Sequence, residues 1–505
     1  MKKFAILLIW VYSLLVNGLL FAQNRNSVWI FGDSTGINFS NINSPIPIFS
    51  AMDSRGSSCS ISDTAGSLLF YASGSDPLQS LVNETVKVRN NLNQIIANGD
   101  SIIGRIWYQE LTITDNPTTY KQFYLFSIGV TSSDGFYYSV IDMNANGGLG
   151  SVTQKNIQLE TFKVVDGMIA IKHGNGRDWW VLLRNADIYS NNHYVYLITQ
   201  GSVSSPIIQA VGSDNNTNSG RYTISNDGSK LSYINFKGLL EIYDFDRCTG
   251  LISNPVTIHP EPPSSPYFNR FWSSEFSFNK RFIYISTYSN DTSFLYQYDL
   301  LNPNPGSSRI LLDSTTNSLI GFGFLRRGPN EKIYFSKAYQ CSIFPYCYPY
   351  PDSVYNIYNM NLSVINHPDS LGTACNYAPY SFYLGGKRTY YSLPNNPDYD
   401  LSALNGSPCD SLSSISETNA FSEAELFIYY TSDLQTAFIN ANRLKGKNYY
   451  LEVFDLLGKS IIKESGNIFP PHFTKNLNCS SFSNGMYIVN LVTDKERLVK
   501  RFVVR

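Results

Sequence analysis

The chain has 505 residues, of which 43% are hydrophobic, 14% aromatic and 15% charged, so it is long enough for more than one domain. Its formal net charge is only −1, which gives no global field to recruit nucleic acid or an anionic membrane, and we expect no nucleic-acid partner. The 36 Tyr and 31 Phe, with few long amphipathic helix patterns, indicate a β-rich protein.

Residues 1–22 read MKKFAILLIWVYSLLVNGLLFA, with two lysines, an apolar run and a small residue at the end. This pattern predicts a cleaved signal peptide, and Asn17 and Gly18 interrupt the run, which argues against a membrane anchor. No later apolar stretch is long enough to span a bilayer, so we expect no transmembrane segment in the mature chain. The sequence therefore predicts export across the inner membrane by the Sec route.

Residues 23–395 contain a repeated unit of strand, tight turn, strand, longer loop and strand. The clearest turn positions, Gly176, Gly228, Lys280 and Glu331, are separated by 52, 52 and 51 residues. Further strands follow two of the hairpins, as IYDFD at residues 242–246 and YQYDL at residues 296–300. Units of this length and form are typical of the blades of a β-propeller.

Six such units fit into residues 57–365. A seventh combines SVWIFGDSTGINFS at residues 27–40 with YSFYLGGKRTYYSLP at residues 380–394. Joining both ends of the body in one blade would remove its free strand edges. The prediction is an all-β body with a propeller of about seven blades, and six or eight blades are the alternatives.

The hairpin tips and the strand faces give more specific expectations. Asp227-Gly228 and Asn175-Gly176 suit two-residue turns that need positive φ, so we interpret them as turn formers and not as catalytic groups. A further set of hydrophobic residues should pack blade against blade. They are Ile224, Leu231, Tyr233, Phe276, Ile283 and Tyr284.

Five segments share one likeness: WIFGDSTGINFS, CSISDTAGSLLFY, GFYYSVIDMNANGGLG, SNDGSKLSY and IYDFDRCTGLISNP. Together they resemble a Bacteroidetes family of secreted propellers with WD40-like blades. The resemblance covers most of residues 27–395. It implies a propeller on an exported protein, and it implies no reaction.

The segment AYQCSIFPYCYPYPDSVY at residues 338–355 breaks the period of the repeat. Its prolines and tyrosines suit neither a central strand nor a helix. One interpretation is a loop that covers a face of the propeller. The other is a contact surface for an unknown protein or glycan, in which Tyr346, Tyr348 and Tyr350 present amphipathic rings to the partner.

Seven cysteines are spread thinly through the chain, and the odd number leaves at least one thiol unpaired. In an exported protein they allow a few disulfides. Cys341 and Cys347 flank a short loop and are one candidate pair. Cys375 with Cys409, which would fasten the end of the body, are another, although spacing alone does not supply the required geometry.

After the body, residues 396–420 are polar and rich in turn formers, which marks a linker. Residues 421–505 hold seven short strand-like runs, which suggest a small β-sandwich. The net charge is +6 over residues 443–505 and −9 over residues 23–442, so the tail is a separate domain.

The tail also resembles a known family. GKNYYLEVFDLLG at residues 446–458, GMYIVNL at 485–491 and KRFVV at 500–504 are similar in spacing and order to the type A C-terminal sorting domain of the type IX secretion system. YYTSD at residues 429–433 stands where that domain usually has Pro-Asn-Pro. The resemblance implies contact with the type IX machinery and a protein that is secreted or attached at the cell surface. The matching positions are Gly446, Asp455, Gly458, Gly485, Tyr487, Lys500 and Arg501.

A search for catalytic motifs gives no candidate. The five histidines show no metal-binding spacing, and the phosphate-cradling and nucleophile-elbow motifs are missing. Asp244 and Asp246 lack the glycine and terminal acid of an EF-hand loop, so we interpret them as turn acids. We predict no catalytic residue, metal or cofactor and favour a secreted or cell-surface binding protein of unknown ligand. The alternative is a secreted hydrolase or lyase acting on glycan or peptide, with acids from different blades at the mouth of the propeller channel.

Overall fold

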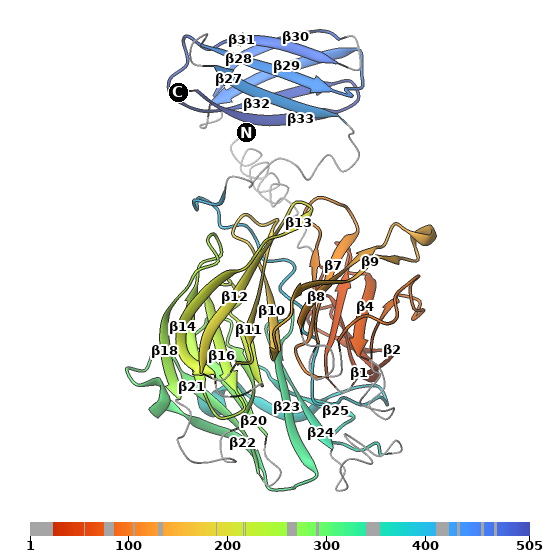
Figure 1. Cartoon of the computed structure of the whole chain (residues 1–505), viewed down its shortest axis with the longest axis vertical. Coiled ribbons are helices and arrows are strands. Elements are labelled where there is room, and N and C mark those ends of the chain that lie inside the picture. Colours follow the sequence, from red (N-terminus) through yellow and green to blue (C-terminus); the bar gives the residue numbers. More distant parts are fainter. Residues whose placement is uncertain are drawn as a thin grey trace, which may run out of the picture. The chain divides into compact units, whose positions relative to one another are not determined.

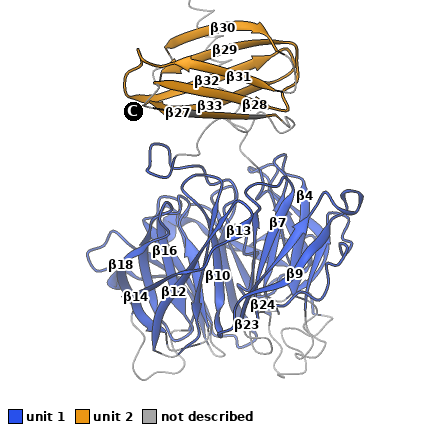
Figure 2. Cartoon of the chain, turned by 45° about the horizontal axis from the view of Figure 1, so that its top comes forward, with its two compact units in different colours: residues 1–411 blue, residues 412–505 orange. Residues whose placement is uncertain are grey.

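The computed structural model describes residues 24–54, 56–74, 85–104, 107–129, 135–187, 189–215, 217, 219–259, 270–288, 292–339, 354–410, 424–431, 435–455, 459–468 and 472–504. The chain divides into two compact units, residues 1–411 and 412–505 (Figure 2). Over the described ranges no helix has the length and apolar character needed to cross a membrane. The expected signal peptide lies outside them. The helices that lie wholly within the described ranges are short 3-10 turns at Asn146–Gly148, Pro305–Ser308 and Gly372–Cys375.

The described part of the first unit forms seven antiparallel sheets (Figure 1). The first two contain β1 (Val28–Asn38) and β2 (Ile46–Ser54), then β3 (Ser58–Ser62), β4 (Leu68–Gly74) and β5 (Val86–Asn90). The third contains β6 (Leu111–Asp115), β7 (Gln122–Gly129), β8 (Gly135–Asp142) and β9 (Ser151–Glu160). The fourth contains β10 (Val164–Lys172), β11 (Trp179–Asn185), β12 (Ser190–Thr199), β13 (Ser202–Val203) and β14 (Ile207–Asn215).

The remaining three sheets each hold four strands in chain order. The fifth contains β15 (Gly220–Ile224), β16 (Lys230–Asn235), β17 (Leu240–Phe245) and β18 (Ile252–His259). The sixth contains β19 (Phe271–Phe276), β20 (Phe282–Thr287), β21 (Ser293–Asp299) and β22 (Ile310–Thr315). The seventh contains β23 (Ile320–Arg327), β24 (Ile333–Tyr339), β25 (Asn361–Ile365) and β26 (Tyr377–Tyr383).

The first strands of these sheets lie at the centre of the unit. The strands β3, β6, β10, β15, β19 and β23 are almost fully buried, and each of the first five contacts the first strand of the next sheet in chain order. The last strands, such as β18 and β26, are largely exposed or half-buried. Sheets arranged radially in this way form a β-propeller, which confirms the predicted all-β propeller of about seven blades.

The hairpin turns confirm the sequence repeat. Gly176, Gly228, Lys280 and Glu331 have φ values of 74°, 74°, 63° and 64°. In each turn the N–H of this residue donates to the carbonyl three residues earlier. Lys280 and Glu331 accept a backbone conformation that favours glycine because the tight hairpin between two paired strands requires it. Asp227-Gly228 and Asn175-Gly176 are turn residues, as predicted.

The predicted blade-to-blade packing is also found. Of the six hydrophobic residues that the sequence singled out, one, Ile224, is half-buried and packs at the edge of a core cluster. The other five are buried in the clusters between blades. They are Leu231, Tyr233, Phe276, Ile283 and Tyr284.

The two ends of the body meet at Asp33 and Arg388. The Asp33 N–H donates to the Arg388 carbonyl (3.0 Å), and Arg388 Nε donates to the Asp33 carboxylate (2.8 Å). The predicted closing segment, residues 380–394, is divided between two places. Residues 380–383 belong to β26 of the preceding sheet, and the closing contact comes from Arg388.

The second unit contains seven strands in its described residues, as the sequence predicted. One sheet is formed by β27 (Glu425–Thr431), β28 (Thr436–Asn442) and β31 (Phe473–Asn478). The other is formed by β30 (Ser460–Asn467), β29 (Asn448–Asp455), β32 (Gly485–Thr493) and β33 (Arg497–Val504). The two sheets share one hydrophobic core, so the predicted small β-sandwich is confirmed.

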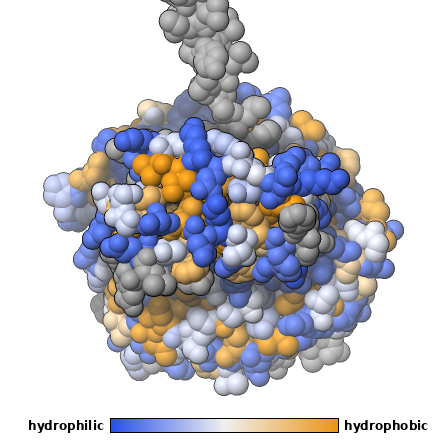
Figure 3. Space-filling model, turned by 90° about the horizontal axis from the view of Figure 1, so that it is seen from above, coloured by the Kyte–Doolittle hydropathy of each residue, from blue (hydrophilic) through white to orange (hydrophobic). Residues whose placement is uncertain are grey.

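One face of the molecule is seen in the space-filling view of Figure 3. On the face in Figure 3, small clusters of hydrophobic residues are separated by hydrophilic ones. Scattered hydrophobic residues are ordinary on protein surfaces. Recognition on this face would therefore depend on local features.

Candidate functional site

The chain after the last sheet fills the centre of the propeller. We call residues 389–402 the channel segment. The Asn395 side chain donates hydrogen bonds to the Leu111 carbonyl of β6 (3.0 Å) and the Met168 carbonyl of β10 (2.9 Å). Buried carbonyls need such partners, so the segment satisfies the inner strands that it crosses. Its buried members include Tyr391, Ser392, Leu393, Asn395, Asn396 and Tyr399.

The far end of the channel segment is fastened by an arginine and a disulfide. Arg247 is 3% exposed and donates to the carbonyls of Lys172 (2.9 Å) and Ser402 (2.6 Å). Beyond the segment, Cys409 forms a disulfide with Cys248 in the turn after β17. These contacts hold the end of the body against the hairpin-turn end of the propeller.

This disulfide differs from the pairs that the sequence suggested. Cys409 is bonded to Cys248, 161 residues away in sequence, and Cys375 is a buried free thiol, so the Cys375–Cys409 suggestion was wrong. The physical reason is that the channel segment carries Cys409 across the ring to the β17 turn, which spacing alone does not reveal. Cys341 and Cys347 lie outside the described residues.

A cavity of about 560 Å³ opens over the channel segment at the hairpin-turn end of the first unit. We call it the mouth pocket. Lys172, Asp398 and Asp400 contribute charged groups to it, and Ile42 and Phe278 contribute exposed apolar side chains. Its volume lies within the range of small-molecule sites, roughly 300–1,000 Å³. The pocket therefore combines both signs of charge with apolar surface.

Lys172 is the most deeply buried cation of the mouth pocket. Its side chain lies at the end of β10, is 7% exposed, and donates from Nζ to the Tyr399 carbonyl (2.9 Å). Nζ also lies 4.9 Å from the ring centroid of Trp179. Burial lowers the pKa of Lys172. A buried ammonium with a single carbonyl acceptor among the described residues has further N–H groups to offer a ligand.

Asp398 and Asp400 stand side by side at the mouth. The Asp400 N–H donates to Asp398 Oδ1 (3.1 Å), and the Arg25 N–H donates to Asp400 Oδ1 (3.4 Å). Desolvation by the surrounding protein, followed by the Asp398 charge, raises the pKa of Asp400 to about 7. Asp400 is also exposed at the rim, where solvent screens part of this effect. Near neutral pH its carboxyl group can donate or accept a hydrogen bond.

Three of the other charged residues of the pocket, Glu275, Arg326 and Arg327, are engaged within the protein. The Arg327 N–H donates to Glu275 Oε2 (3.0 Å), and the two side chains form an ion pair at 3.9 Å. Arg326 donates to the Asn396 carbonyl of the channel segment. No cluster of three or more metal-ligating side chains occurs in the described part of the chain. Besides the exposed Glu331, the charged groups that can meet a ligand are the Lys172 ammonium and the Asp398 and Asp400 carboxyls.

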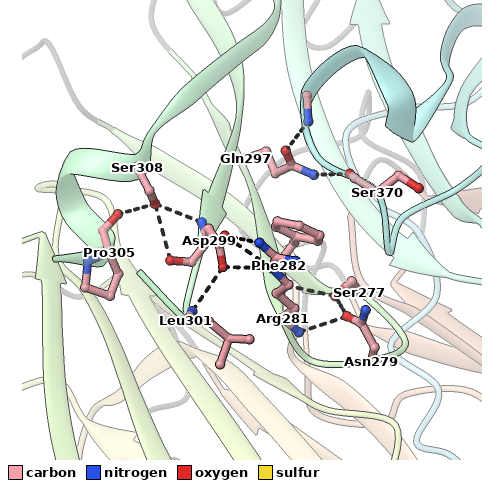
Figure 4. A network of polar contacts seen from close by, with 11 residues as sticks. Ser277, Asn279, Arg281, Phe282, Gln297, Asp299, Leu301, Pro305, Ser308 and Ser370 are labelled. Atoms are coloured by element: carbon pink, nitrogen blue, oxygen red, sulfur yellow. Dashed lines mark hydrogen bonds and ion pairs between the residues drawn. The ribbon is translucent and has the colours of Figure 1, made fainter. Parts of the chain in front are cut away.

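The acids that the sequence interpreted as turn residues have that role. Asp244 forms an ion pair with Lys230, and Asp246 accepts the Cys248 N–H (2.8 Å). Figure 4 shows the related arrangement in the next sheet, where Arg281 pairs with Asp299 (2.8 Å). These acids hold strand ends together at the propeller rim.

Comparison with known families identifies the tail. Residues 435–505 match the model of the secretion system C-terminal sorting domain. The second unit thus carries a sorting domain. No curated protein matches the chain.

Solved structures similar to the chain are distant. A proposed 6-phosphogluconolactonase of Bacteroides fragilis has 10% identity and a TM-score of 0.43, with coverage of 72% of this chain and 96% of that one. A periplasmic gluconolactonase of Pseudomonas aeruginosa has 11% identity and a TM-score of 0.40, with coverage of 72% and 96%. The β-propeller domain of Swd1 from Myceliophteria thermophila has 9% identity and a TM-score of 0.34, with coverage of 62% and 92%.

The described sorting-domain positions predicted from sequence lie partly at turns and strand ends and partly within strands. Gly446 has a φ of 114°, and a Cβ there would come within 2.5 Å of Asp494 Oδ1, so glycine is required. The Asp455 N–H donates to the Lys459 carbonyl (3.0 Å). Tyr487 is buried and donates to the Ser483 carbonyl (2.9 Å). Gly485 begins β32, Lys500 and Arg501 lie in β33, and Gly458 lies outside the described residues.

Sequence reasoning missed the residues of the mouth pocket. It placed Asp398 and Asp400 in a linker, and it did not single out Lys172 or Phe278. Tyr346, Tyr348 and Tyr350 lie outside the described residues, so their role stays a prediction. Two features of the sequence could have indicated the pocket. They are the acids on either side of Tyr399 in PDYD, at residues 397–400, and the aromatic Phe278 at a turn position.

Proposed function

We propose that this chain is an exported binding protein, in which the propeller holds a ligand at the mouth pocket and the tail directs export. The observation that carries the proposal is the sorting domain at residues 435–505. It supports handling by the type IX machinery and a final location outside the cell or at its surface. In this proposal residues 1–22 direct the preceding Sec step.

The mouth pocket supports a ligand-binding role for the propeller. It has the size of a small-molecule site and combines a buried ammonium, two carboxyls and exposed apolar side chains. The surrounding turns are held by hydrogen bonds and ion pairs, which limits the entropy lost on binding. Tyr346, Tyr348 and Tyr350 are proposed as a second contact surface, for a protein or glycan partner.

A secreted hydrolase or lyase is the second candidate, and one observation favours it. Asp400, whose pKa is raised to about 7, and Lys172, whose pKa is lowered, line the same pocket. Titratable groups with opposed shifts in one cavity are common where proton transfer occurs. In that role Asp400 would serve as the acid.

A screen of the purified chain without residues 1–22 separates the two candidates. Polysaccharides and peptides are offered with and without calcium, and retention and product formation are both measured. Retention of an intact compound supports the binding protein, and cleavage of a retained compound supports the enzyme. Absence of both would contradict the proposed role of the mouth pocket.

A further inference from the structure

Phe278 is an unusual residue for its position. It is 40% exposed and lies in the turn between β19 and β20. The matching positions in four other hairpins, two residues before the positive-φ residue, are Thr64, Gly174, Asn226 and Pro329. The turn therefore needs no aromatic ring there. The exposed ring instead adds a flat apolar surface to the mouth pocket.

The turn that carries Phe278 is fixed on both sides. The Asn279 N–H donates to Asp369 Oδ1 (2.9 Å), and the Lys280 ammonium pairs with Asp227 of the neighbouring sheet. Within the turn, the Ser277 and Asn279 side chains are hydrogen-bonded to each other (2.8 Å; Figure 4). The ring is thus presented on a preorganised loop, so little freedom is lost when a ligand packs against it.

The polar groups of the same pocket complement that ring. Lys172 offers N–H donors from a buried ammonium, and Asp398 offers carboxylate oxygens. Asp400 offers a carboxyl group that is a donor when protonated and an acceptor when ionised. A sugar ring has an apolar face of C–H groups and a rim of hydroxyls that both donate and accept. The apolar face of the sugar therefore matches the Phe278 ring, and its hydroxyls match the polar groups of the pocket.

We propose that the mouth pocket binds a neutral glycan, with one sugar ring stacked on Phe278 and its hydroxyls bonded to Lys172, Asp398 and Asp400. This assignment rests on the proposed binding function and names its ligand class. Charge also favours it, because the pocket holds both signs and its Arg327 is already paired with Glu275. A peptide bound by strand pairing is less well matched, since only short stretches of strand, such as residues 170–172 of β10, reach the described walls.

Isothermal titration calorimetry on the exported chain without residues 1–22 tests this. The probes are neutral tetrasaccharides of glucose, xylose, mannose and N-acetylglucosamine, with a set of short peptides for comparison. We expect at least one tetrasaccharide to bind. Phe278→Ser should weaken that binding by about tenfold or more because it removes the stacking surface. Lys172→Met, which keeps the buried stem and removes the donor, should weaken it similarly.

Phe49→Ser is the matched control, because Phe49 is 60% exposed on β2 and does not line the mouth pocket. It should change the affinity by less than about twofold, and thermal melts should show that all variants are folded. A folded wild type that binds no tetrasaccharide, or one whose binding Phe278→Ser leaves unchanged, overturns the glycan assignment. Peptide binding that depends on Phe278, without sugar binding, overturns the assignment and leaves the proposed binding function standing. If neither the tetrasaccharides nor the peptides bind at the pocket, the result counts against both the glycan assignment and the proposed binding function.

Discussion

Asp400 links the mouth pocket to pH. Its pKa in the folded chain is about 7, against an ordinary value of 3.8. A carboxyl whose pKa is raised on folding binds more protons in the folded state than in the unfolded state between these values. The free energy of unfolding therefore falls as the pH rises from about 4 to about 7. Above that range Asp400 is ionised in the folded chain, and the destabilising cost of its desolvated charge is fully present. The exposed position of Asp400 makes this cost smaller than for a buried acid.

Asp400→Asn should remove this pH dependence, because an amide has no charge to desolvate. Relative to wild type, the variant should gain stability on going from pH 5 to pH 8. Urea titrations at the two pH values, followed by tryptophan fluorescence, report on the propeller because all the tryptophans lie in the first unit. Asp100→Asn, on an exposed loop, is the control. A difference between variant and wild type that is the same at both pH values would contradict the account.

At the residue scale, prediction succeeded where backbone geometry selects the residue type. Asp227-Gly228 and Asn175-Gly176 were identified because a tight hairpin needs positive φ, and the same spacing located Lys280 and Glu331. It failed at Lys172, Asp398 and Asp400. These side chains come from distant parts of the chain, and only the closed ring brings them to one cavity.

At the element scale, the channel segment decides how the propeller is held together. Its composition, with Pro, Asn and Asp, is that of a linker, and the sequence placed its second half in one. The structure instead buries Asn396 and Tyr399 inside the ring, with exposed fractions of 1% and 0%. Amino-acid composition identifies turn-forming residues, but it does not show that such a segment is buried in the centre of a propeller.

Replacing Cys248 and Cys409 together by serine should release the end of the channel segment. The disulfide closes a loop between residues 161 apart, and loss of such a link typically costs about 2–5 kcal/mol. The midpoint of urea unfolding, read by tryptophan fluorescence, should fall accordingly. Reduction of the wild-type protein with dithiothreitol should lower it by a similar amount. An unchanged midpoint in both experiments would show that the disulfide does not stabilise the segment.

At the scale of the whole molecule, the sequence repeat predicted the ring and its approximate number of blades. The contact that joins the ends was only partly predicted, because residues 380–383 continue the preceding sheet and Arg388 makes the bond to Asp33. Sequence period locates blades, but it does not show which strand of an incomplete blade comes from which end.

Asp33→Ala should weaken this closure. It leaves the Arg388 guanidinium, whose side chain is 5% exposed, without the carboxylate that now binds it. Loss of one partner from a buried ion pair costs about 3 kcal/mol or more, so the urea midpoint of the propeller should fall clearly. Asp100→Ala breaks the exposed pair with Lys155 and should cost about 0.5 kcal/mol or less. An equal decrease in the free energy of unfolding of the two variants would show that the ring is closed elsewhere.

The central claim is that the tail directs export of a propeller. The most direct measurement is cell fractionation with quantitative immunoblotting of the full chain and of a chain that lacks residues 418–505. The account predicts that the full chain reaches the cell surface or the medium. The shortened chain should accumulate in the periplasm as a folded propeller, since its ring, channel segment and disulfide all lie within residues 24–410. A shortened chain that reaches the surface or medium at the level of the full chain would contradict the account.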